Sequence, residues 1–282
     1  MMIHKPAPGA LDAHQARPWA DVPVDRLAAV RGVMTDIDDT LTRDGAIEPG
    51  ALDALSALQA AGVPVVAITG RPLGWSEPFA RAWPVRAVVA ENGAVALIRD
   101  GQQLITEYVQ DAATRAANTR RLHDVAQRVL REVPGATLAR DRAGRVTDIA
   151  VDHNEFTTLP PAALAQVVAL MREEGMNATV SSIHINGWFG EHTKWSAAQW
   201  MLQRLFGRTP SDEIPDWVYV GDSTNDQLMF RHVPLSVGVA NLRRFAAELH
   251  TWPAYITVAE RGAGFAEVAR AVLAARARST PE

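Results

Sequence analysis

Continuous hydrophobic runs alternate along this chain with segments in which hydrophobic residues recur every three or four positions. The runs 32–34, 63–68, 85–90 and 217–220 are short and rich in valine, which predicts buried strands. The segment 50–62 spaces its leucines three residues apart and ends at a glycine, which predicts a helix with one buried face. Because strands and helices alternate, we predict an α/β fold built on a doubly wound parallel sheet.

The pattern changes in the middle of the chain. The runs 95–98 and 104–108 flank an Asp-Gly pair, which predicts a hairpin. A helix over 112–131 follows, and strands near 146–151 and 178–185 bracket a helix over 161–174. This order predicts a small antiparallel sheet that carries two helices. The parallel pattern resumes with a helix over 193–205, strands over 217–220 and 236–240, and a final helix over 265–275.

We therefore divide the chain into three parts. Residues 1–29 form an extension, which we expect Trp19 and Leu27 to pack against the rest of the protein. Residues 30–94 and 188–282 form a catalytic core, and residues 95–187 form an inserted domain of mixed α and β structure.

Composition excludes several classes of protein. The net charge of -4 and the absence of a basic run argue against a nucleic-acid partner or an anionic membrane surface. Without cysteine there is no disulfide, no thiolate nucleophile and no zinc site with cysteine ligands. The first 20 residues hold no continuous hydrophobic stretch, so we expect a cytoplasmic protein that acts on a small molecule. The sequence carries no signal for an oligomeric state.

Acidic residues follow two of the predicted strands directly. Asp36 and Asp38 come after the run 32–34, and Asp222 and Asp226 come after the run 217–220. Clustered carboxylates repel one another, so a site that keeps them ionised usually supplies a divalent cation. That cation implies an oxyanionic substrate, most simply a phosphate.

These residues are expected to meet at one edge of the sheet. Asp36, Thr69 and Asp222 each follow a strand by one or two residues, and ligands of parallel sheets bind beyond the carboxyl ends of the strands. Residues two apart in an extended segment face the same way, so Asp36 and Asp38 are expected to address one reacting centre. The chain has two lysines, Lys5 and Lys194, and the second stands just before a predicted helix, which suggests a chemical requirement for an ammonium group.

Four ordered motifs carry a resemblance to the haloacid dehalogenase superfamily of phosphatases. They are Asp36-Ile37-Asp38-Asp39-Thr40, Thr69, Lys194 and the segment from Gly221 to Asp226. The insert between the second and third motifs, preceded by Asn92-Gly93-Ala94, resembles the cap of the Cof-type and sucrose-phosphate phosphatase-like branch. The resemblance implies a Rossmann-like core, an inserted α+β cap and a Mg²⁺-dependent phosphatase for a small, sugar-like phosphomonoester.

The resemblance also implies a role for each matching residue. Asp36 would attack phosphorus to form an aspartyl-phosphate, and Asp38 would serve as general acid and then as general base. Mg²⁺ would bind the side chains of Asp36 and Asp222 and the backbone carbonyl of Asp38, with Asp226 in support. The groups implied to bind the phosphoryl oxygens are Thr69, the Gly70 amide and Lys194.

Other candidate residues keep two interpretations. Arg71 either contacts phosphate or substrate or forms a surface ion pair. Asn225 and Asp226 either cap the next helix or belong to the site, and both interpretations can hold. Asn92 and His184 are candidates for substrate binding, whereas the segment 152–155 is interpreted as a solvated turn. Many members of the family have Gly at the position of Asp39, and Ser at the position of Thr69.

Two other functions stay open at this point. A sugar phosphomutase or phosphotransferase would use the same aspartyl-phosphate with a sugar as acceptor. A receiver-like phosphate-binding domain without enzymatic activity also gathers Asp, Thr and Lys around Mg²⁺, but its phosphorylated Asp lies in mid-chain, whereas Asp36 stands near the start of the core.

Overall fold

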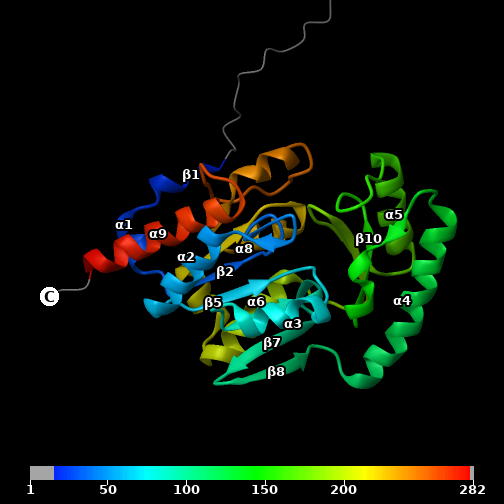
Figure 1. Ribbon diagram of the computed structural model, residues 1–282, viewed down its shortest axis with the longest axis horizontal. Helices are drawn as coiled ribbons and strands as arrows, with labels where there is room; N and C mark the ends of the chain where they lie inside the picture. Colours follow the sequence, from blue (N-terminus) through cyan, green and yellow to red (C-terminus); the bar gives the residue numbers. More distant parts are fainter. Residues whose placement is uncertain (1–15, 280–282) are drawn as a thin grey trace, which may run out of the picture.

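The computed structural model describes residues 16–279 and contains a nine-stranded sheet beside a separate four-stranded sheet (Figure 1). Seven neighbouring strands of the large sheet pair in parallel, and the last two pair antiparallel. The α/β, doubly wound fold predicted from the sequence is confirmed. In spatial order the strands are β1 (Arg17–Pro18), β15 (Tyr255–Ile256), β14 (Leu235–Gly238), β13 (Trp217–Gly221), β2 (Gly32–Thr35), β5 (Val65–Ile68), β6 (Ala87–Ala90), β7 (Val95–Asp100) and β8 (Gln103–Tyr108).

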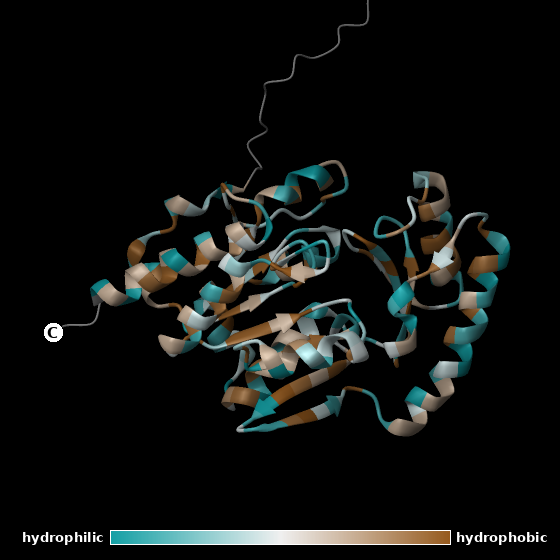
Figure 2. Ribbon diagram, viewed as in Figure 1, coloured by the Kyte–Doolittle hydropathy of each residue, from teal (hydrophilic) through white to brown (hydrophobic). Residues whose placement is uncertain are grey.

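Helices cover both faces of the large sheet, which explains why its central strands are hydrophobic without alternation. Residues of α1 (Val24–Ala28), α2 (Pro49–Ala60), α3 (Leu73–Ala82) and α9 (Arg261–Ser279) pack in one core. Residues of α6 (Lys194–Phe206) and α8 (Gln227–His232) pack in a second core on the opposite face. The central strands are correspondingly hydrophobic in Figure 2. Two short elements complete this part, the β3 (Thr42–Arg43) and β4 (Ala46–Ile47) pair and α7 (Pro210–Glu213).

The register of the central strands brings their carboxyl ends to one edge. Val220 of β13 lies opposite Thr35 of β2, and Thr35 lies opposite Ala67 of β5. The residues that follow these strands, Asp36 among them, therefore begin their loops at the same edge of the sheet.

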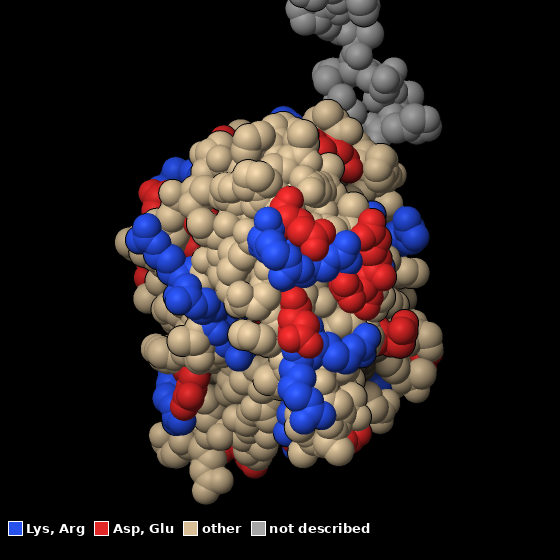
Figure 3. Space-filling view, turned by 90° about the vertical axis from the view of Figure 1, so that its right-hand side faces the viewer, with Lys and Arg blue, Asp and Glu red and all other residues tan. Residues whose placement is uncertain are grey.

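The smaller sheet is antiparallel and lies to the right in Figure 1. Its strands are β11 (Asn177–Val180), β12 (His184–Trp188), β10 (Asp148–Asp152) and β9 (Thr137–Leu138) in spatial order. With α4 (Ala112–Glu132) and α5 (Pro161–Glu173) it encloses a third hydrophobic core. Arginine and acidic side chains are intermixed on the face of the molecule seen in Figure 3. Arg128 of α4 pairs with Glu132, Glu173 and Glu174.

Two predictions about this middle region are wrong. The hairpin over 95–108 was assigned to the small sheet, but β7 pairs with β6 and extends the large sheet. The first four residues of β7 are all buried, so both faces of the strand must be covered. Residues of the two cores on opposite faces of the large sheet cover them. The single strand over 178–185 is in fact two strands, because the Ser181 hydroxyl accepts hydrogen bonds from the amides of Ile183 and His184 and turns the chain. The boundaries between the three parts of the chain stay a prediction.

The N-terminal arm packs as the sequence indicated. Trp19 is 2% exposed, lies edge-on against Tyr255, and shares a core with Leu27. Lys5 lies outside the described residues. Within residues 16–279, none of the helices combines the length and the hydrophobicity that a membrane span requires.

Candidate active site

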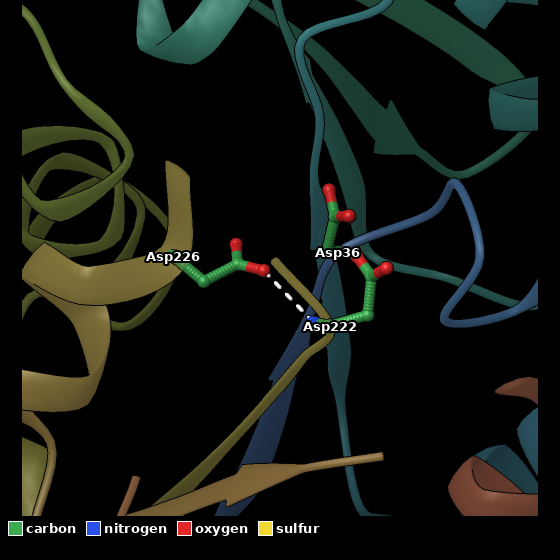
Figure 4. A group of neighbouring side chains, drawn as sticks. All are labelled: Asp36, Asp222 and Asp226. Atoms are coloured by element: carbon green, nitrogen blue, oxygen red, sulfur yellow. Dashed lines mark hydrogen bonds between the residues drawn. The ribbon is translucent and has the colours of Figure 1, made fainter. Parts of the chain in front are cut away.

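Three buried carboxylates meet beyond the ends of β2 and β13 (Figure 4). Asp36 follows β2 and Asp222 follows β13, while Asp226 ends a short 3-10 helix, Thr224–Asp226. One oxygen of each lies within 4.8 Å of the others. The sequence therefore placed these residues at the correct edge, and folding brings them close enough to share one cation.

Asp226 organises the loop after β13. Its Oδ2 accepts hydrogen bonds from the amides of Asp222 at 2.9 Å and Ser223 at 3.1 Å. Its Oδ1 accepts from the Tyr219 hydroxyl and from the Lys194 ammonium. A Cβ on Gly221 would lie 2.5 Å from the same carboxylate, so only glycine fits there. Asp226 thus both closes the capping box with Ser223 and belongs to the acidic cluster.

Lys194 is the cation at the centre of the cluster. It begins α6, and Thr193 before it caps the helix through the Ser196 amide. Its Nζ donates to Asp36 Oδ1 at 2.7 Å, to Asp226 Oδ1 at 2.8 Å and to Asn225 Oδ1 at 3.4 Å. Burial lowers the pKa of Lys194, but the two carboxylates outweigh this and raise the pKa above its usual value. Lys194 is therefore an ammonium ion at neutral pH.

The cluster holds more negative charge than Lys194 balances. Burial raises the pKa of Asp36 to about 7, and the charges of Asp226 and Asp38 add to this while Lys194 opposes it. Burial and the charge of Asp36 raise the pKa of Asp222 well above its usual value. The Oδ1 atom of Asp222 is buried and has no hydrogen-bond partner among the described residues. Carboxylate oxygens, one of them unpartnered, fit a hard divalent cation such as Mg²⁺.

Asp38 lies beside the cluster and is bound by an arginine. Arg71 Nε donates to both carboxylate oxygens of Asp38 at 3.0 Å. The same guanidinium reaches Asp141 at 3.3 Å and Glu155 at 2.7 Å, both from the part of the chain that carries the small sheet. Arg71 is 4% exposed, so its interpretation as a surface ion pair is wrong. Burial raises the pKa of Asp38, and the charge of Arg71 opposes the rise.

The turn after β5 presents buried polar groups. Thr69 is fully buried and its hydroxyl accepts from the Arg71 amide at 3.0 Å. The Gly70 carbonyl accepts from Arg145 at 3.0 Å and from Asn186 at 3.2 Å. Asn92 adopts φ 55°, and its buried Nδ2 has no partner within residues 16–279. A Cβ on Gly70 would lie 3.3 Å from the Asn92 amide oxygen, so Asn92 lies directly beside this turn.

The remaining candidates lie farther from the carboxylates. His184 Nε2 donates to Glu155 at 2.8 Å and does not contact the acidic cluster. Asn225 accepts from the Ser223 hydroxyl at 2.9 Å as well as from Lys194. Asp39 adopts φ 55°, a conformation that favours glycine, and binds Arg244 and Arg261. Asp39 thus forms ion pairs with two arginines from a backbone conformation that is strained for any residue other than glycine.

A polar cavity of about 250 Å³ opens beside Asp38. The loops of both sheets contribute to it. Sequence reasoning missed Arg244 here, because nothing in its local pattern distinguishes it from a surface charge. Glu155 belongs to the segment 152–155, and the interpretation of that segment as a solvated turn gave it no role in the site. The cavity is lined by Asp38, Asp39, Thr42, Asp44, Gly45, Arg71, Asn154, Glu155, Phe156, Ile183, Arg244 and Arg261.

Comparison with known proteins identifies relatives of this arrangement. Residues 33–129 match the family model described as haloacid dehalogenase-like hydrolase. A phosphoglycolate phosphatase from Methanothermobacter thermautotrophicus is 27% identical over 247 residues, which cover 86% of this chain and 98% of the relative.

Solved structures share the fold at low sequence identity. A Thermoplasma acidophilum protein superimposes with a TM-score of 0.65 at 15% identity, covering 86% of this chain and 98% of that one. The sucrose-phosphatase of Synechocystis gives 0.62 at 15% identity with the same coverage, 86% and 98%. The C-terminal domain of the C. albicans trehalose-6-phosphate phosphatase gives 0.65 at 12% identity, covering 94% and 100%.

Proposed function

We propose that this chain, a haloacid dehalogenase-like phosphohydrolase, uses Mg²⁺ to hydrolyse a small, sugar-like phosphomonoester through an aspartyl-phosphate on Asp36. The observation that carries the proposal is the acidic cluster itself. Asp36 lies between a buried ammonium, Lys194, and a buried carboxylate, Asp222, that has one unpartnered oxygen. The proposed reaction needs a nucleophile, a fixed positive charge and a carboxylate oxygen that is free to bind a metal ion. Asp36, Lys194 and Asp222 would supply them in that order.

The first step would be attack by Asp36 on phosphorus. Lys194 binds Oδ1 of Asp36, which leaves Oδ2 to form the new P–O bond while the bond to the leaving alcohol breaks. Asp38 would give its proton to the departing oxygen. In the second step Asp38 would take a proton from water, and the resulting hydroxide would attack the aspartyl-phosphate to release phosphate and regenerate Asp36.

The cation would be held by the side chains of Asp36 and Asp222 and by the backbone carbonyl of Asp38. When bound, Mg²⁺ would offset the repulsion between the carboxylate nucleophile and the anionic phosphate. Thr69, the Gly70 amide and Lys194 would donate to the phosphoryl oxygens, and the unpartnered Nδ2 of Asn92 beside Gly70 is a further donor for them.

The small sheet with α4 and α5 would act as the cap that excludes water during the reaction. The printed names of two structural relatives refer to sucrose and trehalose phosphates, and that of the curated relative to phosphoglycolate. The leaving group would lie in the cavity of about 250 Å³ beside Asp38. A cytoplasmic location stays a prediction.

Phosphate release tests the proposal. Purified protein with Mg²⁺ is expected to release inorganic phosphate from members of a panel that includes sugar phosphates and phosphoglycolate, and a chelator is expected to stop the release. Asp36→Asn is expected to abolish turnover, whereas Asp53→Asn, an exposed site on α2, is expected to leave it unchanged. Undiminished turnover by Asp36→Asn would eliminate the nucleophile. Transfer of phosphate to a second sugar without its release would identify a phosphotransferase instead.

A further inference from the structure

One guanidinium connects the two sheets at the point where Asp38 meets the cavity. Arg71 Nε contacts both oxygens of Asp38 at 3.0 Å, and Arg71 NH2 contacts Glu155 Oε1 at 2.7 Å. Its NH1 reaches Asp141 at 3.3 Å, and the ring of Trp75 lies 4.8 Å from the guanidinium carbon. Asp38 and Trp75 belong to the core, whereas Glu155 and Asp141 come from the region between β8 and β12. This buried cation thus contacts both parts of the chain.

Glu155 is itself held firmly by the region that carries it. The loop after β10 folds around the buried carboxylate of Asp152, which accepts hydrogen bonds from the amides of Asn154, Glu155 and Phe156. His184 on β12 donates to Glu155 Oε2 at 2.8 Å. Oε2 therefore faces the small sheet, and Oε1 faces Arg71. The interpretation of segment 152–155 as a solvated turn is wrong for Asp152, which is 2% exposed, whereas Asn154 is exposed as expected.

Glu155 is ionised in this position. Burial raises its pKa, but the hydrogen bond from His184 and the charge of Arg71 outweigh burial and lower the pKa to about 2. Oε1 is thus a charged acceptor for Arg71, and such bonds are shorter and stronger than those between neutral groups.

We propose that Glu155 is a positioning residue that fixes Arg71, and through Arg71 the proton-donating carboxyl group of Asp38, when the small sheet closes over the core. The inference rests on the proposed function. Arg71 is 4% exposed, so the loss of the Glu155 acceptor would leave a buried N–H group without a partner. The guanidinium would turn to recover one, and Asp38, bound by Nε through both oxygens, would turn with it.

The position of Asp38 matters differently for different leaving groups. An alkoxide leaving group is strongly basic and needs the proton of Asp38, whereas p-nitrophenolate leaves readily without one. Misplacing Asp38 should therefore slow the hydrolysis of an alkyl phosphate far more than that of p-nitrophenyl phosphate. A change that merely loosened the fold would slow both reactions equally.

The experiment compares Glu155→Met, which has no oxygen to accept from Arg71, with the wild-type chain on glycerol 2-phosphate and on p-nitrophenyl phosphate, each with Mg²⁺. We expect kcat for glycerol 2-phosphate to fall by at least about tenfold, within the roughly 10²–10⁴-fold range of general acid catalysis. For p-nitrophenyl phosphate we expect a change of less than about threefold, by the same reasoning. Glu173→Met, at an exposed residue of α5 that pairs with Arg128, is the matched control and should behave as wild type.

Two further variants make the result decisive. Asp38→Asn should show the same selectivity, and adding Glu155→Met to it should cause no further loss, because both changes act on one group. His184→Gln alters the contact that holds Glu155 Oε2, so it should reproduce the selectivity more weakly, and it replaces Glu155→Met if that variant does not fold.

Four results would overturn the inference. Equal losses of kcat on the two substrates would indicate a structural role, and a higher KM with unchanged kcat would make Glu155 a substrate contact. Independent, multiplicative losses in the double variant would separate Glu155 from Asp38. A wild-type chain inactive on every phosphomonoester would refute the proposed function and this inference with it.

Discussion

Asp222→Asn should make the metal-free protein more stable while removing its response to Mg²⁺. The carboxylate of Asp222 is fully buried, its Oδ1 has no partner among the described residues, and its Oδ2 has only the long contacts from Arg244 at 3.2 Å and Asn241 at 3.3 Å. An amide of nearly the same shape would keep an acceptor oxygen for these contacts without the charge.

The magnitude follows from the distances in the cluster. Carboxylate oxygens of Asp36 and Asp222 lie within 4.8 Å of one another, and two unit charges at this distance repel by about 3.5 kcal/mol at an effective dielectric constant of about 20. This repulsion, together with burial, is what raises the pKa of Asp222. A folded-state pKa above the unfolded value means that the folded protein loses stability as pH rises from the ordinary value of 3.8 toward the folded value.

The assay is urea unfolding in EDTA at several pH values from 4 upward. The advantage of Asp222→Asn over wild type should be absent near pH 4, should grow by about 1.4 kcal/mol for each pH unit above it, and should level off at the pKa of Asp222 in the folded protein. Added Mg²⁺ should stabilise the wild-type chain and leave the variant unchanged. Asp53→Asn, an exposed substitution of the same type, is the control. A difference in unfolding free energy between wild type and Asp222→Asn that stays constant across this pH range would refute the reasoning.

Three other substitutions test the packing that supports the site. Lys194→Met leaves Asp36 and Asp226 without their buried cation, so we expect a loss of about 3–5 kcal/mol in unfolding free energy, measured in EDTA. Gly93→Ala should cost more than about 1 kcal/mol because Gly93 has φ 112° and a Cβ there would lie 2.5 Å from the Thr193 carbonyl; Gly135→Ala, at φ 84° with open space, should cost less. Trp19→Ala removes a ring that is 2% exposed, and a loss of about 3–5 kcal/mol in urea unfolding would confirm that the N-terminal arm is part of the core. An unchanged unfolding free energy for any of the three would contradict its prediction.

The residues of the candidate site differ in how far their positions could be predicted from the sequence. Asp36 and Asp222 were predictable because each follows a short hydrophobic strand directly, and the geometry of parallel sheets alone brings such residues to one edge. The hairpin over 95–108 was misplaced because strand pairing partners are not encoded in local periodicity. Arg71 was recognised as a candidate, but its burial between Asp38 and Glu155 depends on a loop 84 residues away.

The sequence by itself determined the alternation of strands and helices, the order of the four motifs and the residues at the strand ends, since these depend on neighbours along the chain. Only the tertiary structure decided which charges face one another. It left Asp222 Oδ1 without a partner, placed Lys194 between Asp36 and Asp226, and set Glu155 against Arg71. The electrostatic energy of such groups depends on distance and burial, and both are fixed when remote segments pack together.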